Sequence, residues 1–309
     1  MTPAQTQPAP AAHQKHIAGG LTLALLGAVA FSGKAIIVKL AYRYGVDAVT
    51  LIMYRMLFAL PIFATMAWWA SRGQPPLSAR DWRGVAGLGV TGYYLASFLD
   101  FAGLAYITAG LERLILYLNP TLVLLLGWLL YRRGIHARQV LGMAISYCGV
   151  ALVFGQEAYQ HGAQGTHTAW GVLLVFLSAV SYAVYLVYSG EMLQRIGALR
   201  LVGLATSVAC LCCLLQFAAL RPLSAAVVAP EVLWLSLLNA TLCTAAPVLM
   251  VMMAIERIGA STAAQTGMVG PLSTILMGVW ILGEPFTAWM AAGTALVVAG
   301  IFVFTRKAR

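Results

Sequence analysis

Charge is scarce in this chain, and the scarcity decides the class of protein. Of the 309 residues only 9% are charged, whereas 61% are hydrophobic. In soluble domains roughly a quarter of the residues are charged. The core of one soluble domain could not bury this much apolar surface, so we expect lipid to be the surrounding solvent.

The predicted spans contain no histidine, and the cysteines lack the spacing of a metal site. The five histidines fall in predicted tails and loops, at positions 13, 16, 136, 161 and 167. The five cysteines show neither the spacing of a zinc site nor the even number of a disulfide framework. A Walker A motif is also missing, which disfavours an ATP-driven pump. We therefore predict no metal and no cofactor.

Long apolar runs are abundant. A helix needs about 20 mostly apolar residues to cross a bilayer, and ten stretches meet this requirement. They cover roughly residues 17–39, 48–70, 83–101, 105–131, 138–155, 169–189, 199–219, 232–254, 258–282 and 287–305. The pattern predicts an all-α, polytopic membrane protein. We expect residues 1–16, rich in Pro, Ala and Gln, to be a disordered tail rather than a cleaved signal peptide.

Basic residues lie mainly on one side of the predicted membrane. If the N-terminus is cytoplasmic, 13 of the 19 Lys and Arg fall in cytoplasmic segments, three on the opposite side and three within spans. This is a strong positive-inside bias. It predicts that both termini are cytoplasmic, including the basic tail 306–309. It also accounts for the net charge of +10 without a nucleic-acid partner.

The chain contains an internal repeat. A shift of 151 residues aligns the two halves without gaps and places Pro120 on Pro271, Gly127 on Gly278, Gly142 on Gly293 and Gly149 on Gly300. Each half, 17–155 and 169–305, holds five predicted spans, and an odd number forces the halves into opposite orientations. Inverted repeats are typical of secondary transporters, which bind substrate between the halves near mid-membrane.

Three stretches carry a resemblance to a known family. FSGKAIIVKLAY, LERLILYLNPTLVLLLGWLL and LGEPFTAWMAAGTALVVAGI resemble the EamA-type branch of the drug/metabolite transporter superfamily. The resemblance implies ten helices in two inverted five-helix repeats around a central cavity, and export of amino acids or other small metabolites across the bacterial inner membrane. The family often has Gly-Glu after its fourth and ninth helices. Gly283–Glu284 matches this, whereas the first repeat has Arg132–Arg133 instead.

Five ionisable residues lie within predicted spans, all of them in the first repeat: Lys34, Arg55, Asp100, Glu112 and Arg113. With a helix rise of about 1.5 Å per residue, all five fall within about 10 Å of the outer interface. Charges at this depth need partners or water. We therefore predict a charge network at the outer end of the central cavity. A purely structural pairing between helices remains the alternative, because adjacent Glu112 and Arg113 point about 100° apart.

Polar residues recur on single faces of several other helices. Such faces do not look at lipid, so they line a cavity or form hydrogen bonds between helices. We predict that the cavity and substrate site are lined by Lys34, Tyr93, Ser97, Glu112, Tyr117, Asn119, Tyr182, Tyr185, Asn239 and Gln265.

Two prolines and a row of alanines are expected to shape the helices. Pro120 and Pro271 each remove a backbone hydrogen bond, so we predict helix bends there, around the substrate site. Ala291, Ala295 and Ala299 are spaced by four and predict a helix-packing face. Trp68, Trp69, Trp82, Trp170 and Trp289 lie at span ends, as in an interfacial aromatic belt.

The pattern as a whole favours a secondary transporter over an enzyme, a channel or a structural subunit. No span contains a histidine or a recognisable catalytic dyad. The three bases and two acids suit an amphoteric amino acid, with an organic anion or a nucleoside-like metabolite as alternatives. The expected partners are a small-molecule substrate and the lipid bilayer, with the protein a monomer. Direction and energy source are not evident from the residues.

The charge bias generates a topological prediction. A reporter protein fused after Arg309 is expected to be active in the cytoplasm, because the basic loops remain on that side. A fusion that is active only on the opposite side would contradict the assigned orientation.

Overall fold

A computed structural model describes residues 10–132, 134, 136–160, 165–267 and 269–305, and every structural statement below refers to these residues. Their regular elements are all helices. Eight helices are long and apolar enough to cross a membrane, and two shorter apolar helices, Leu272–Leu282 and Ala288–Val303, follow them. The predicted all-α membrane fold is thus confirmed.

The first half runs from α1 to α7. Its elements are α1 (Pro10–Tyr42), α2 (Ala48–Ser71), α3 (Ala79–Leu88), the π-helical η1 (Gly89–Leu95), α4 (Ala96–Leu104), α5 (Ala109–Leu116), α6 (Asn119–Tyr131) and α7 (Ala137–Gln160). The helix α1 begins already at Pro10, so it includes part of the segment expected to be a disordered tail. Residues 1–9 lie outside the described part.

The second half runs from α8 to α13. Its elements are α8 (Gly165–Ile196), α9 (Ala198–Leu220), the short η3 (Leu223–Ala226), α10 (Pro230–Ala240), the π-helical η4 (Thr241–Ala245), α11 (Ala246–Gly267), α12 (Gly270–Met277), η5 (Gly278–Leu282) and α13 (Ala288–Thr305). The predicted boundary between the eighth and ninth spans, at residues 254–258, is wrong. Helix α11 continues through it to Gly267, since no proline or left-handed glycine interrupts the segment.

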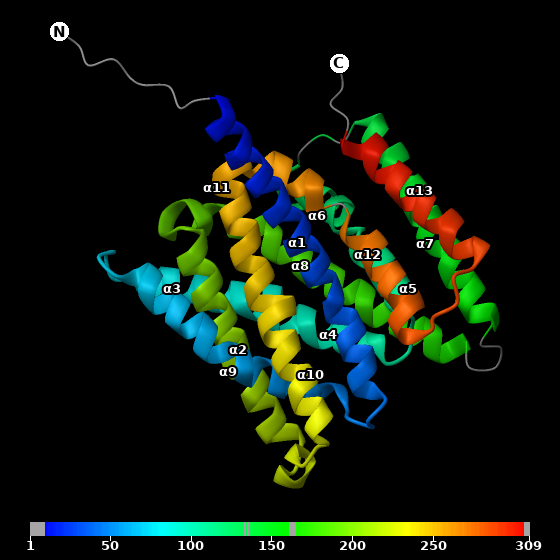
Figure 1. The fold of residues 1–309 in the computed structure, drawn as a ribbon, viewed down its shortest axis with the longest axis horizontal. Helices are drawn as coiled ribbons and strands as arrows, with labels where there is room; N and C mark the ends of the chain where they lie inside the picture. Colours follow the sequence, from blue (N-terminus) through cyan, green and yellow to red (C-terminus); the bar gives the residue numbers. More distant parts are fainter. Residues whose placement is uncertain (1–9, 133, 135, 161–164, 268, 306–309) are drawn as a thin grey trace.

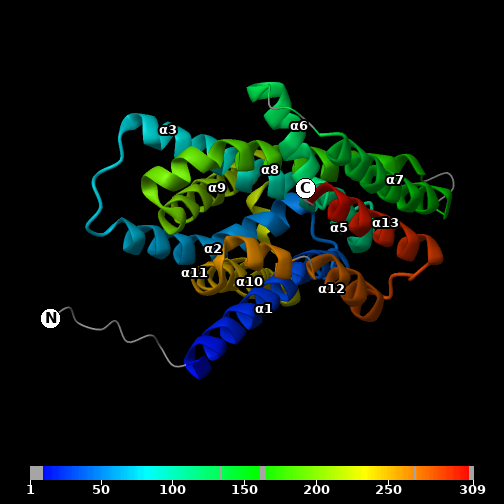
Figure 2. The ribbon, with the colours of Figure 1, turned by 90° about the horizontal axis from the view of Figure 1, so that it is seen from above.

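Helix packing follows the repeat. Helices α7 and α13 pair along one edge of the molecule, and α2 and α9 pair along the other (Figures 1 and 2). Each of these pairs joins counterparts in the two repeats. Between them, α1 packs on α11 and α4 packs on α8. The 151-residue shift places α1 on α8 and α4 on α11, so it converts one of these contacts into the other. Such exchange is what a twofold relation between the halves requires.

Glycines bring α7 and α13 into close contact. A Cβ at Gly293 would lie 2.7 Å from the Gly149 carbonyl oxygen, and one at Gly300 would lie 2.6 Å from the Gly142 carbonyl oxygen. The 151-residue shift converts one contact into the other. The predicted alanine face is wrong: Ala291, Ala295 and Ala299 are exposed. Only glycine lets the two backbones approach this closely, so the glycine face is the one that packs.

Irregular segments also recur at matching positions. The π-helical turns η1 and η4 lie at equivalent places in the two repeats. The helix breaks at Tyr117–Leu118 and again, one shift later, before α12. Arg132 adopts a left-handed backbone conformation with φ 51°, as does its counterpart Gly283 with φ 73°. The fold therefore retains a glycine-like turn where the family's Gly-Glu pair is replaced by Arg132–Arg133.

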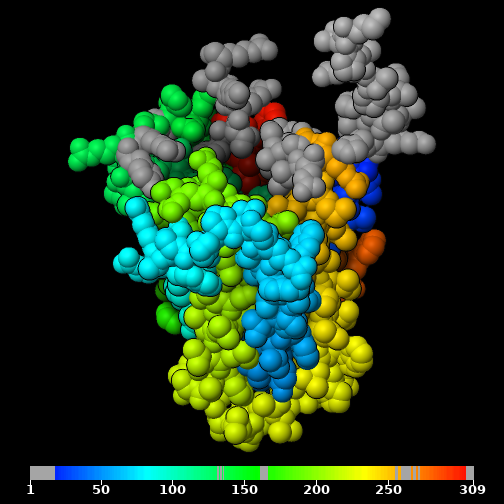
Figure 3. All heavy atoms as spheres, turned by 90° about the vertical axis from the view of Figure 1, so that its left-hand side faces the viewer, coloured from blue at the N-terminus to red at the C-terminus, as the bar shows by residue number. Residues whose placement is uncertain are grey.

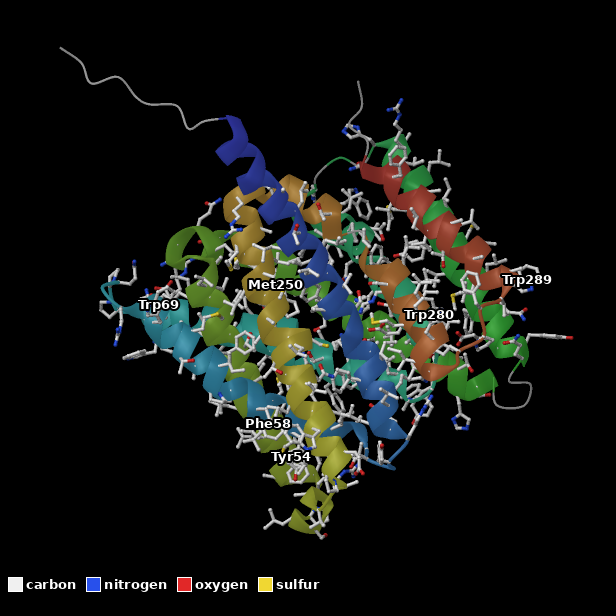
Figure 4. The ribbon with its side chains drawn as sticks, in the orientation of Figure 1. Tyr54, Phe58, Trp69, Met250, Trp280 and Trp289 are labelled. Atoms are coloured by element: carbon white, nitrogen blue, oxygen red, sulfur yellow. The ribbon has the colours of Figure 1, made fainter. Side chains whose placement is uncertain are left out.

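The two ends of the described chain lie together, and two tryptophans lie at the periphery of the bundle. Helix α1 begins and α13 ends at the same end of the bundle (Figure 1). Figure 3 shows α2, α3 and α9 together on one face of the molecule. Trp69 and Trp289 lie at the periphery with exposed side chains, away from the helix interfaces (Figure 4).

We expect Gly293→Leu to destabilise the protein by about 1–3 kcal/mol, because the new side chain would meet Val153 and the Gly149 backbone. Thermal unfolding in detergent measures the effect. Ala295→Leu, two residues further along α13 on its exposed face, is the matched control and should unfold as the wild type does. Equal behaviour of the two variants would contradict the glycine-mediated contact.

Candidate functional site

The centre of the candidate site is an ion pair between α1 and α4. Lys34 Nζ lies 2.5 Å from Asp100 Oδ2, and both side chains are almost fully buried. The two residues stand 66 positions apart in the sequence and meet because α1 packs beside α4. The pair allows both charges to lie within the helical bundle, where either one alone would be costly.

Glu112 lies beside this pair on α5 and is completely buried. Its Oε1 is 3.9 Å from Lys34 Nζ, and its Oε2 is 3.9 Å from Arg113 Nε. Neither oxygen has a hydrogen-bond partner among the described residues. A carboxylate between two cations at this distance is attracted to both but bonded to neither. Both of its oxygens therefore remain available to a further donor.

Arg113 connects the first repeat to the second. Its Nε donates to Thr274 Oγ1 of α12 at 3.0 Å. The ring of Phe31 on α1 lies 5.6 Å from the Arg113 guanidinium and 5.7 Å from Lys34 Nζ. One aromatic ring thus adjoins both cations, within the range of cation–π attraction.

Arg55, the third predicted base, lies apart from the acids. Its guanidinium donates to Thr244 Oγ1 of η4 and lies over the ring of Phe101 at 5.2 Å. Within the described residues it forms no ion pair with Asp100 or Glu112. The predicted network thus comprises four paired residues, and Arg55 is held by a hydroxyl group and an aromatic ring.

Asn239 brings the second repeat to Lys34. Its Nδ2 lies 3.5 Å from the Lys34 carbonyl oxygen, a long contact, and the side chain is 1% exposed. Around the network several buried polar atoms lack partners in the described structure: Asp100 Oδ1, both Glu112 oxygens, Arg113 Nη2, Arg55 Nη1 and Asn239 Oδ1. Buried polar groups in proteins are nearly always satisfied, so this concentration is characteristic of a site that receives a polar ligand or water.

The predicted tyrosines form a second cluster. Tyr93 Oη and Tyr185 Oη are 3.1 Å apart, and Tyr182 stacks on Tyr185 with ring centroids 5.4 Å apart. They pack with Val85, Leu88 and Met192 rather than with the charges. Ser178, next to them on α8, donates to the Ala96 carbonyl oxygen at 2.6 Å. The Ser178 hydrogen bond thus holds α8 against α4. Ser97, next to Ala96 on α4, is half-buried.

The remaining predicted residues adjoin the helix breaks. Tyr117 lies in the turn between α5 and α6, and Asn119 donates to the Leu116 carbonyl oxygen at 2.7 Å. Pro120 and Pro271 stand in the first turns of α6 and α12. The N–H groups of a helix's first turn have no intrahelical partner, so a proline there costs no hydrogen bond. Both prolines thus start a new helix. The side chains of Gln265 and Pro271 lie outside the described residues.

Sequence reasoning missed a second set of charges at the turn between α4 and α5. Glu284, from the second repeat, accepts the N–H groups of Ala109 and Gly110 at 2.9 and 3.4 Å. Buried Glu157 of α7 accepts the Thr108 hydroxyl, and Lys39 donates to the Ile107 carbonyl oxygen at 2.8 Å. The span predicted to end at 155 excluded Glu157, although α7 continues to Gln160.

Three cavities lined by described residues lie away from the charge network. They have volumes of about 420, 470 and 710 Å³. The first lies between α3 and α8, and the other two adjoin the turn between α4 and α5. Lys34, Asp100, Glu112 and Arg113 line none of the three. All four side chains are buried in the bundle.

Comparison with known proteins agrees with the repeat and the helical bundle. The model of the EamA-like transporter family matches residues 18–155 and again residues 169–306. The chain belongs to this family. It is therefore a multi-pass membrane transporter, and the two matched regions coincide with the two repeats.

Relatives of similar length occur in bacteria and archaea. The Bacillus subtilis (strain 168) protein "Uncharacterized transporter YcbK" is 29% identical over 281 residues, which cover 87% of each chain. A protein of Archaeoglobus fulgidus with the name "Uncharacterized transporter" is 24% identical, covering 90% of this chain and 94% of its own. One solved crystal structure superposes with a TM-score of 0.58 at 18% identity, covering 93% and 96% of the two chains. It supports the fold alone.

The Lys34–Asp100 pair generates a stability prediction. Asp100→Asn should destabilise the protein by about 3 kcal/mol, because it takes the hydrogen-bonded carboxylate from the Lys34 ammonium and leaves only Glu112 at 3.9 Å. The double variant Lys34→Met/Asp100→Asn removes both charges and should recover most of the loss. Thermal unfolding of the two single variants and the double variant measures the coupling. Additive losses would show that the contact contributes nothing.

Proposed function

We propose that this transporter exports amino acids or related amphoteric metabolites by alternating access. The observation that supports this most is the buried cluster of Lys34, Asp100, Glu112 and Arg113, which lies against the second repeat. Inverted-repeat transporters bind their substrates at such an interface. In this proposal the cluster is the substrate site.

The chemistry of the cluster matches a zwitterion. A substrate carboxylate would take the open donor of Arg113, whose Nη2 lacks a partner. A substrate ammonium would lie between Asp100 and Glu112, each with an unpartnered oxygen, and against the ring of Phe31. Either charge alone would leave the other set of groups unpaired, so a molecule carrying both is favoured. An organic anion is the second candidate, because Arg55 gives the five charges an excess of one base; a nucleoside-like metabolite is the third.

Helix breaks at matching positions support the alternating movement. The turn at Tyr117–Leu118 separates α5, which carries Glu112 and Arg113, from α6. The equivalent break precedes α12, which carries Thr274. Each short helix can tilt about its break without disturbing a continuous hydrogen-bonded ladder. Opposite tilts of the two would expose the cluster to one side of the membrane at a time.

The proposal includes an orientation. The positive-inside bias of the loops supports cytoplasmic termini, with the membrane being the inner membrane of a bacterial cell. The cluster then lies nearer the outer face, at the side where export ends. A channel is the rival within the same fold, and exchange distinguishes the two, because a channel does not catalyse counterflow.

Glu112→Gln tests the cluster in proteoliposomes, with exchange measured across a panel of amino acids. Gln keeps the shape of the side chain and removes its charge, which leaves three buried bases against one acid. We expect thermal stability to fall by about 2–3 kcal/mol and counterflow to fall with it.

A different result would assign another role to Glu112. If stability and exchange persist while only pH-driven accumulation disappears, the residue carries the coupling proton instead. Wild-type stability together with wild-type, pH-dependent transport would remove Glu112 from the site. Absence of counterflow for every amino acid in the panel, in protein that is folded, would contradict the proposed substrate class.

A further inference from the structure

A groove between α3 and α8 is distinct from the charge cluster. It has a volume of about 420 Å³, and its lining comes from one face of each helix at helical spacing. It lies at the end of α8 near Arg195, on the side of the membrane to which the loop arginines were assigned. The transport proposal makes no use of it.

One end of the groove is basic. Arg80, Arg83 and Arg195 line it, together with a single acid, Glu191. Arg195 is engaged by Asp81 at 2.7 Å. Arg80 and Arg83 are exposed, and in the described structure neither forms an ion pair within 4.0 Å. Two guanidinium groups thus line the groove without an ion-pair partner within 4.0 Å, although Arg83 Nε also donates to the Ala79 carbonyl oxygen at 3.4 Å. Each offers planar donors suited to a phosphate.

The rest of the groove is apolar and open. Leu88, Val184 and Met192 line it. Gly87, also in the lining, would carry a Cβ with no atom within 4 Å, so the space above this glycine is empty. Its neighbour Gly84 is different, since a Cβ there would lie 3.2 Å from Met192 Sδ. An elongated apolar group can therefore lie beside Gly87, along the seam where α3 meets α8.

The predicted topology puts the groove at the level of lipid headgroups. Trp82 lies between the two arginines in sequence and is 48% exposed, as interfacial tryptophans are. Basic pockets between membrane helices on the cytoplasmic side attract anionic lipids, whose headgroups are held near the surface. A soluble anion would use the arginines but would have no need of the apolar channel that continues from them.

We propose that this groove binds an anionic phospholipid, with the phosphodiester at Arg80 and Arg83 and an acyl chain along the seam beside Gly87. The two parts of the site can be removed separately. Arg80→Gln/Arg83→Gln removes the charge and leaves the seam, whereas Gly87→Leu fills the seam and leaves the charge. All three positions are exposed, so the variants are expected to fold.

The test uses purified protein in detergent with phosphatidylglycerol or phosphatidylcholine added, and measures retained lipid by native mass spectrometry and the unfolding temperature. Wild-type protein should retain phosphatidylglycerol preferentially and be stabilised by it. Each arginine removed should weaken retention about fivefold, and Gly87→Leu should weaken it while the arginines are intact. Arg138→Gln and Gly155→Leu, at exposed positions outside the groove, are the matched controls and should behave as the wild type.

Three results would overturn the proposal. The first is wild-type retention by Arg80→Gln/Arg83→Gln or by Gly87→Leu. The second is an equal loss of phosphatidylglycerol retention in the control variants, which would indicate lipid binding over the whole membrane-facing surface rather than in the groove. The third is stabilisation by inorganic phosphate or glycerol phosphate equal to that by phosphatidylglycerol, which would make the groove a site for soluble anions.

Discussion

The contact between the Lys34 ammonium and the Asp100 carboxylate is the interaction on which the centre of this protein depends. A charge within a membrane bundle is costly unless an opposite charge meets it, and this pair is 2.5 Å apart with both side chains buried. It joins α1 to α4. Glu112 extends the charges to α5, and Arg113 reaches α12 through Thr274. Polar contacts buried away from lipid therefore position four helices of the two repeats, α1, α4, α5 and α12, relative to one another.

The duplication preserved the scaffold but not its chemistry. Close glycine contacts, π-helical turns and helix breaks recur at equivalent positions, because each satisfies a demand of backbone packing that both halves share. The charges have no such counterpart: Lys34, Asp100 and Glu112 stand where the second repeat has Tyr185, Val251 and Ala263. The second half contributes hydroxyl and amide groups instead. One half thus supplies the charges and the other supplies neutral partners around them.

The short helix α5 links the two polar groups of the molecule. Its first N–H groups are bound by Glu284 of the second repeat, and Glu112 and Arg113 follow within the next turn. A carboxylate at a helix N-terminus is favoured both by hydrogen bonds and by the helix dipole. Movement of the second repeat would therefore shift α5, and with it the charges at the cluster. Glu284 comes from the Gly-Glu pair that only the second half retains.

Composition and periodicity alone determined the membrane class, the helical fold, the two repeats and the five charged residues within the predicted spans, because each depends on which residues lipid can accept. Only the tertiary structure decided the partners. Asp100, at the end of its span, meets Lys34, whereas Arg55 turns to Thr244 and the tyrosines form a cluster of their own. It also selected Gly293 over Ala295 as a packing residue and brought Glu157 and Glu284 to the start of α5. These outcomes depend on helix rotation and on contacts between residues far apart in the chain, which spacing along one helix does not encode.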